Sequence, residues 1–116
     1  MGSIRIEEIT TARQLLELPE DFGPCELVRG ELTMMSPAGS LHGRIETRLM
    51  LRLGVFVEER RLGLVFPGDT GFFLEQDKDT VRSPDVAFVA PARIPPEMPK
   101  GFFPGAPDLA VEIRSP

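Results

Sequence analysis

One long amphipathic segment, residues 40 to 61, constrains the fold of this chain more than any other feature. Ser40 is a good N-cap, and Gly63 closes the segment as a helix. A helix with a single apolar stripe must bury it, so we expect the helix to pack on a sheet. At about 100° per residue, the only histidine, His42, falls on the apolar face near the helix N-terminus. The stripe consists of apolar residues at helical spacing: Leu41, Ile45, Leu49, Leu53 and Phe56.

Short extended runs bounded by turn residues predict the strands of that sheet. Residues 25–28 and 31–35, joined by an Arg-Gly turn, indicate a β-hairpin near the N-terminus. The run 86–89 has little polar alternation, so we expect a central strand that is covered on both faces. Further strands are expected at 64–66, 70–74 and 109–114, with a short helix at 11–18 and a charged loop at 75–82.

The last quarter of the chain is unusual. Six prolines between residues 91 and 107 exclude both a helix and a central strand, so we expect a long ordered loop or a flexible flap. The length of 116 residues supports a single domain over 1–116. The sequence stops at residues 115–116, directly after a strand that looks buried. We therefore expect an incomplete domain: a fragment, a truncated gene product, or a protein completed by a second copy.

Charge and composition narrow the function classes. With 13 Lys and Arg against 18 Asp and Glu, the net charge of −5 argues against a broad basic surface but allows a local basic patch. The same surplus is compatible with a carboxylate cluster that binds a metal ion. No apolar run approaches the roughly 18 residues of a membrane helix, and no signal peptide is visible. The single cysteine, Cys25, excludes an intrachain disulfide and fits a reducing cytoplasm.

Two acidic residues occupy unusual places for carboxylates. Asp85 stands at the start of the apolar run 86–89, and Glu112 lies between two apolar residues of the last expected strand. Burial penalises a charged carboxylate, so each needs a compensating cation. That cation could be an arginine such as Arg114, in a structural ion pair, or a metal ion. If the two strands are neighbours, Asp85 and Glu112 can converge into an oxygen-rich site suited to Mg²⁺ or Mn²⁺.

Four motifs follow one another in a specific order. They are ELVRGEL at 26–32, SP at 36–37 before His42, SPDVAFV at 83–89 and GAPDLAVEIRSP at 105–116. Together, over residues 10 to 116, they resemble the Uma-type family of restriction endonuclease-like proteins, within the PD-(D/E)XK phosphodiesterase superfamily. The resemblance implies a restriction endonuclease-like α/β (α+β) fold, with a mixed sheet, a long flanking helix, an N-terminal β-hairpin and a divalent metal at the sheet edge.

The resemblance also implies roles for single residues. Asp85 matches the motif's aspartate and Glu112 the acidic residue of the (D/E)xK strand, so together they would bind Mg²⁺ (or Mn²⁺) for phosphodiester hydrolysis. Arg114 stands where the superfamily often has lysine, and similar proteins often carry that lysine in a later helix. A guanidinium is not deprotonated in proteins, so we expect weak or no activity. His42 and Glu31 match positions that such proteins keep near the site.

These assignments have ordinary structural alternatives. His42 could be a hydrogen-bonded packing residue, and Glu31 a solvated residue of a strand. A row of arginines on the long helix could contact phosphate, or could form a solvated flank paired with the helix's own glutamates. The arginines are Arg44, Arg48, Arg52, Arg60 and Arg61, and the glutamates are Glu46, Glu58 and Glu59.

Two function classes follow from the sequence. The first is a metal-dependent endonuclease that acts on DNA, and the second is a non-catalytic interaction or assembly module that keeps the same fold. The retained acids Asp85 and Glu112 favour the first, whereas Arg114 and the net charge of −5 favour the second. The last strand leaves an edge or face that invites pairing, so we expect a homodimer in the cytoplasm and no membrane partner.

Overall fold

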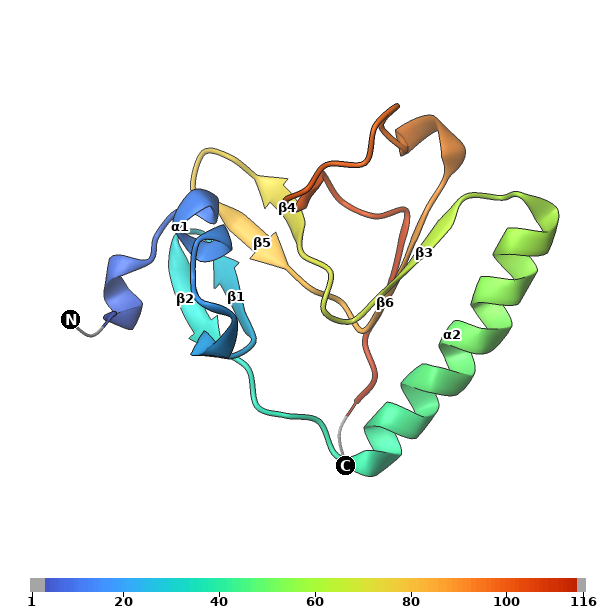
Figure 1. Ribbon diagram of the computed structural model, residues 1–116, viewed down its shortest axis with the longest axis horizontal. Helices are drawn as coiled ribbons and strands as arrows, with labels where there is room; N and C mark the ends of the chain where they lie inside the picture. The colour runs from blue at the N-terminus through green and yellow to red at the C-terminus, as the bar shows by residue number, and fades with distance from the viewer. Residues whose placement is uncertain (1–3, 115–116) are drawn as a thin grey trace. The chain divides into compact units, whose positions relative to one another are not determined.

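The chain folds into two compact units, which the computed structural model describes over residues 4–114. Residues 1–3 and 115–116, the latter ending the last motif, lie outside the described residues. Each unit has a β-sheet of its own, and both sheets can be followed in Figure 1. The first unit contains Met1–Ser36, Gly71–Ser83 and Gly101–Ala106, and the second contains Pro37–Thr70, Pro84–Lys100 and Pro107–Pro116.

The first unit is built on a five-stranded mixed sheet in the order β2-β1-β5-β4-β7. Neighbouring strands are antiparallel except β4 and β7, which run parallel. Arg29 and Gly30, with φ of 49° and 80°, form the two-residue turn of the expected hairpin, because positive φ at both positions matches the strand twist. The strands are β1 (Cys25–Val28), β2 (Glu31–Met34), β4 (Phe72–Glu75), β5 (Thr80–Arg82) and β7 (Phe103–Pro104).

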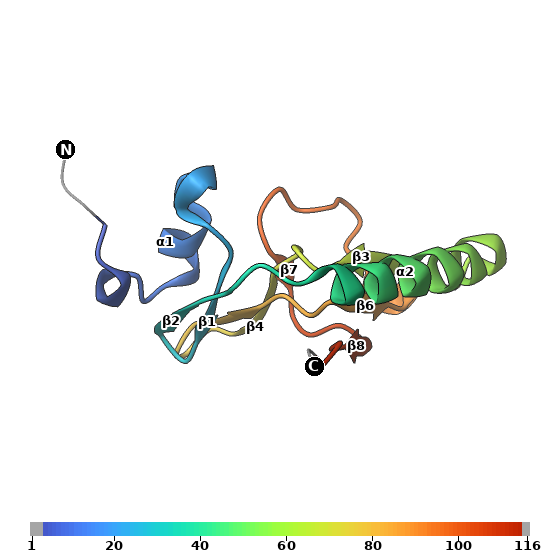
Figure 2. The same cartoon turned by 90° about the horizontal axis from the view of Figure 1, so that it is seen from below.

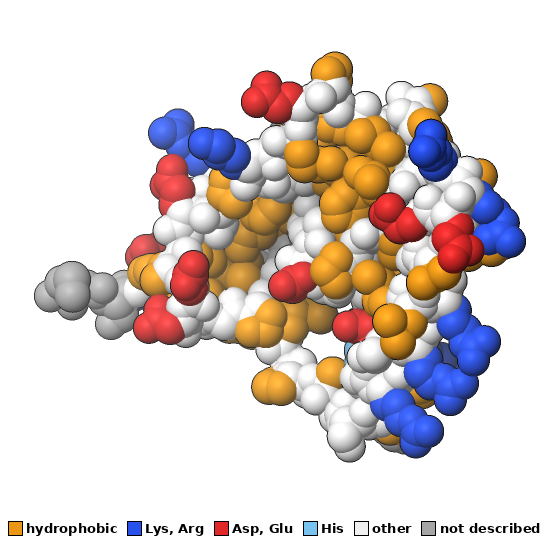
Figure 3. Space-filling model, turned by 45° about the vertical axis from the view of Figure 1, so that its right-hand side comes forward, with side chains coloured by type: hydrophobic (Ala, Val, Ile, Leu, Met, Phe, Trp, Pro, Cys, Tyr) orange, Lys and Arg blue, Asp and Glu red, His pale blue; other side chains and the backbone are white. Residues whose placement is uncertain are grey.

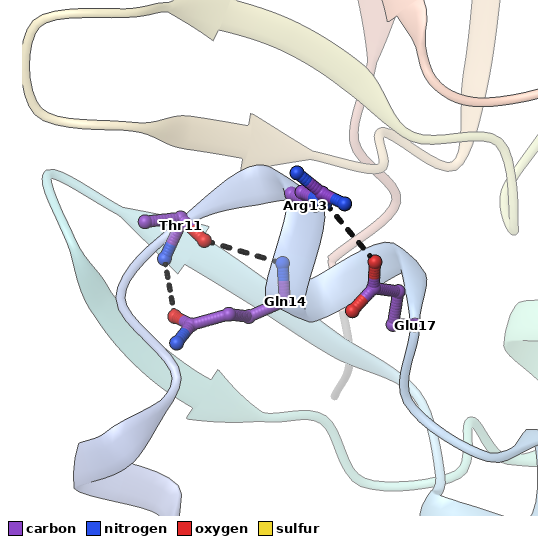
Figure 4. Close-up of polar contacts among 4 residues, drawn as sticks. All are labelled: Thr11, Arg13, Gln14 and Glu17. Atoms are coloured by element: carbon purple, nitrogen blue, oxygen red, sulfur yellow. Dashed lines mark hydrogen bonds and ion pairs between the residues drawn. The ribbon is translucent and has the colours of Figure 1, made fainter.

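A short helix, α1 (Ala12–Leu16), packs on this sheet and begins at a capping box. The Thr11 hydroxyl oxygen accepts the Gln14 amide at 3.2 Å, and the Gln14 side-chain oxygen accepts the Thr11 amide at 3.1 Å (Figure 4). The expected helix start is therefore confirmed. Two short 3-10 helices flank α1: η1 (Ile6–Glu8) and η2 (Glu20–Phe22). The core of the unit is formed by Ile9, Ala12, Leu15, Leu27 and Val81.

The second unit packs one long helix on a three-stranded antiparallel sheet, as the amphipathic segment predicted. The predicted stripe is only partly correct, because Leu49 and Leu53 are half-buried whereas Leu41, Ile45 and Phe56 are exposed. The helix α2 (Ser40–Arg60) contacts β3 (Leu64–Pro67) and β6 (Val86–Val89), and β8 (Leu109–Val111) pairs with the other edge of β6 (Figures 1 and 2). The order β3-β6-β8 makes β6 the central strand, and three of its four residues are buried. The buried or half-buried side chains of α2 are His42, Glu46, Leu49, Met50, Leu53 and Val57.

The ends of α2 differ from the sequence expectation. Gly39, not Ser40, is the N-cap, and no side chain caps that end. The helix closes at Arg61, whose φ of 52° lies in the left-handed region. Gly63 has a different role: its φ is 146°, and an added side chain would collide with the carbonyl of Val89.

Two strands form where loops were expected, and a third is shorter. β5 lies inside the expected charged loop 75–82, because Thr80 and Val81 are buried in the sheet. β7 lies inside the proline-rich stretch 91–107 at the edge of its sheet, a position that tolerates proline. The same stretch begins with a 3-10 helix, η3 (Pro91–Arg93). β8 ends at Val111, three residues earlier than the expected end at 114.

Asp108 fixes the position of β8 on β6. Its backbone amide donates to the Phe88 carbonyl at 2.8 Å, and its carboxylate oxygen Oδ2 accepts the Ala90 amide at 2.7 Å. The antiparallel register that follows places Val86 opposite Val111. Asp108 therefore adds one backbone and one side-chain hydrogen bond to the pairing of the two strands that Asp85 and Glu112 flank.

Replacing Asp108 by alanine removes the acceptor of the Ala90 amide and should lower the free energy of unfolding by about 1 kcal/mol. Asp108→Asn keeps a side-chain oxygen at the same distance from the backbone and should lower the free energy of unfolding by less. Urea unfolding of the wild type and both variants measures the difference. An alanine variant as stable as the wild type would contradict the role given to this contact.

Candidate metal centre

Asp85 is the residue at which the elements of the second unit meet. It directly precedes β6, and its Oδ2 atom accepts the Ile113 amide at 2.7 Å. The same oxygen lies 3.2 Å from Nε2 of His42 on α2. The His42 and Asp85 side chains are only 12% and 19% exposed, so water screens their interaction weakly. One carboxylate oxygen thus links the helix, the central strand and the segment after β8.

Glu46 belongs to the same cluster, although the sequence suggested it only as a partner for the arginine row. His42, Glu46 and Asp85 each offer one ligand atom, and these atoms all lie within 4.8 Å of one another. His42 and Glu46 share a face of α2 because they are four residues apart. That spacing on the buried side of the helix was the signal that could have identified Glu46. One imidazole nitrogen and two carboxylate oxygens form a donor set that fits a divalent metal ion.

The strands beside Asp85 and Glu112 are neighbours, as the metal hypothesis requires. β6 and β8 are antiparallel with Val86 opposite Val111, and the same register continued by one residue sets Asp85 opposite Glu112. The expected burial of Glu112 within a strand is wrong, because β8 ends before this residue and its side chain is exposed. Arg114 is exposed as well. Roles for Glu112 and Arg114 in metal binding or catalysis stay predictions.

Glu31 lies in the first unit, on the hairpin strand β2, where its side chain is exposed. It lines an open pocket together with Glu7 and apolar neighbours. The buried carboxylate of that unit is Glu26 on β1, whose Oε2 accepts the Ser83 amide at 2.7 Å and whose Oε1 lies 3.5 Å from Arg82. Glu26 therefore supports the sheet of the first unit, and a catalytic role for Glu31 stays a prediction.

The arginines of α2 are exposed to solvent. Arg44, Arg48 and Arg52 follow one another at intervals of four residues, and Figure 3 shows Lys and Arg side chains along the side that α2 occupies. Within residues 4–114, no ion pair joins these three arginines to a carboxylate, so the expected pairing with the helix's glutamates does not form. Arg60 instead stacks on Phe56, with its guanidinium carbon 4.0 Å from the ring centroid.

Comparison with known proteins identifies the family. The model of the family described as "Uma2: Putative restriction endonuclease" matches residues 12–116. The chain belongs to the Uma2 family. This assignment confirms the family expected from the motifs. Among curated proteins, none matches the chain.

The fold of this Uma2 chain also occurs in a solved structure. A protein from Anabaena variabilis ATCC 29413, described as a putative nuclease belonging to DUF820, matches with a TM-score of 0.72 at 23% sequence identity. The match covers 90% of this chain and 58% of the other, so this chain spans little more than half of that protein's length. The similarity confirms the expected fold class, an α+β arrangement with a mixed sheet, a long helix and N-terminal strands. Among the described residues, no helix has the length and apolarity to cross a membrane.

Removing the Asp85 carboxylate should affect both stability and one backbone amide. Asp85→Ala leaves the Ile113 amide without its acceptor, which should lower the free energy of unfolding by about 1–2 kcal/mol. Hydrogen exchange of the Ile113 amide should become faster. Urea unfolding and NMR exchange measure the two effects, with the exposed Asp77→Ala as the control. An Ile113 amide that exchanges equally slowly in both variants would contradict this geometry.

Proposed function

We propose that this Uma2 chain is a metal-dependent nuclease domain that hydrolyses phosphodiester bonds in DNA. The observation that carries the proposal is the convergence of His42, Glu46 and Asp85 within 4.8 Å in a chain of this family. Mg²⁺ or Mn²⁺ is the proposed ion, because carboxylate ligands suit both. Asp85 would hold it together with Glu112, which the register of β6 and β8 sets opposite.

Several residues of the second unit would contribute to hydrolysis. A bound divalent ion supplies polarisation of the phosphate and a lowered pKa for an attacking water. The Ile113 amide fixes one oxygen of Asp85, and His42 meets the same oxygen, so the carboxylate is oriented before any ligand arrives. Arg114, two residues after Glu112, would add positive charge for the phosphate.

Turnover should be slow because of Arg114. A guanidinium stays protonated, so it cannot take a proton from water in the way that a lysine at this position could. We expect supercoiled plasmid to be nicked slowly in Mg²⁺ or Mn²⁺, above the metal-free control, and Asp85→Ala to abolish the nicking. Asp77→Ala serves as the matched acidic control and should nick as the wild type does. Nicking that survives Asp85→Ala or chelation would contradict the proposal.

The second candidate function is a non-catalytic interaction or assembly module. The arginine at position 114 favours it, because the superfamily's usual lysine is replaced there. Calorimetry with Mn²⁺ distinguishes the two candidates. A chain that binds no Mn²⁺, together with a Glu112→Gln variant that is more stable and otherwise unchanged, would favour the module over the nuclease.

Assembly and location complete the proposal. A homodimer is supported by β8, an edge strand of its sheet whose residue Leu109 is 47% exposed. A cytoplasmic location is supported by the single cysteine, Cys25, which is half-buried. Sedimentation equilibrium measures the oligomeric state, and a monomer at all concentrations would contradict the proposed homodimer.

A further inference from the structure

We infer that Glu46 is a metal ligand, and that with His42 it forms a two-residue chelate on α2 that makes the site prefer Mn²⁺ over Mg²⁺. This inference deepens the proposed function and rests on its metal site. It concerns the ligands that α2 contributes, whereas Asp85 and Glu112 come from segments next to the sheet strands. A metal-binding measurement, rather than a DNA-cleavage assay, tests it.

The helix geometry brings the two side chains to the same place. His42 and Glu46 are separated by one turn of α2, so both project from the face that packs on β3 and β6. Both side chains are half-buried, as is Asp85. Their ligand atoms and that of Asp85 lie within 4.8 Å of one another, a separation that small side-chain rotations can close around one ion.

Charge balance supports a cation at this position. Glu46 and Asp85 place two carboxylates close together in a partly dehydrated site, which is unfavourable without positive charge. Within residues 4–114, no Lys or Arg forms an ion pair with either carboxylate. His42 is the one basic side chain of the cluster, and a neutral imidazole is itself a metal ligand. A divalent ion would compensate both acids and use all three side chains.

Gly68 leaves the space in which the Glu46 carboxylate lies. A Cβ atom added at Gly68 would come within 3.0 Å of Oε1 of Glu46 and within 3.2 Å of the backbone oxygen of Asp85. Its φ lies outside the left-handed region, so alanine is compatible with the backbone there. A substitution at Gly68 therefore crowds both the Glu46 carboxylate and the Asp85 backbone.

The ligand types set the preference between ions. Mg²⁺ favours oxygen ligands with near-ideal octahedral geometry and retains several waters, whereas imidazole is a better ligand for transition metals. A site with one nitrogen and two carboxylate oxygens should therefore bind Mn²⁺ more tightly than Mg²⁺. Replacing His42 by alanine leaves a site with oxygen ligands alone. The difference between the Mn²⁺ and Mg²⁺ affinities should therefore become smaller.

Calorimetric titration with Mn²⁺ and Mg²⁺ tests the inference on the whole chain. Glu46→Gln keeps the size of the side chain and removes its charge, and should raise the Mn²⁺ dissociation constant at least about tenfold. Glu59→Gln, the same substitution at an exposed position of α2, should bind Mn²⁺ as the wild type does. Gly68→Ala should weaken binding as well, because the new methyl group crowds the Glu46 carboxylate and the Asp85 backbone. Thermal melting without metal verifies that each variant is folded.

The possible results separate this inference from the proposed function. Equal Mn²⁺ affinity in the wild type and Glu46→Gln overturns Glu46 as a ligand, even if the wild type nicks DNA. Equal affinity of the wild type for Mn²⁺ and Mg²⁺ overturns the ion preference. Loss of Mn²⁺ binding in Glu46→Gln with no nicking by the wild type supports the ligand and contradicts the nuclease.

Discussion

A single carboxylate oxygen of Asp85 holds the second unit's functional elements together. It accepts the Ile113 amide at 2.7 Å and lies 3.2 Å from the His42 imidazole, so it joins the segment after β8 to the helix α2. Because the Asp85 side chain is only 19% exposed, each of these contacts is stronger than it would be on the surface. The same residue directly precedes the central strand β6, whose burial gives it a rigid support. A binding group held in this way is oriented before it meets a ligand, which lowers the cost of binding.

The position of Asp85 next to Glu46 also has an electrostatic consequence. Two acids, Glu46 and Asp85, lie close together beside one imidazole, in a chain whose net charge is already −5. Together these side chains supply one nitrogen and two oxygen donor atoms, a set that suits a divalent metal ion. Despite the acidic net charge, the exposed arginines of α2 form a local basic row on the same helix as His42 and Glu46.

The elements that were predicted correctly are those whose sequence patterns span neighbouring residues. The capping box at Thr11, the hairpin around Gly30 and the helix that carries His42 all follow from short-range spacing, and all three form. The strand β5 was missed because its two buried residues lie in a charged context, and only pairing with distant β1 and β4 stabilises it. Glu46 was missed for a related reason: Asp85 is distant in sequence, and the one local signal was the four-residue spacing from His42 on the same helix face. The exposure of Glu112 depends on where β8 ends, and the Asp108 contacts that position β8 involve residues far back in the chain.

The central claim is that a divalent ion binds at Asp85 against α2. Anomalous diffraction from crystals grown with Mn²⁺ tests it most directly, because the manganese signal locates the ion without reference to any activity. We expect one strong peak within coordination distance of Asp85 and of His42 or Glu46. A peak elsewhere on the chain, or no peak at saturating Mn²⁺, would contradict it.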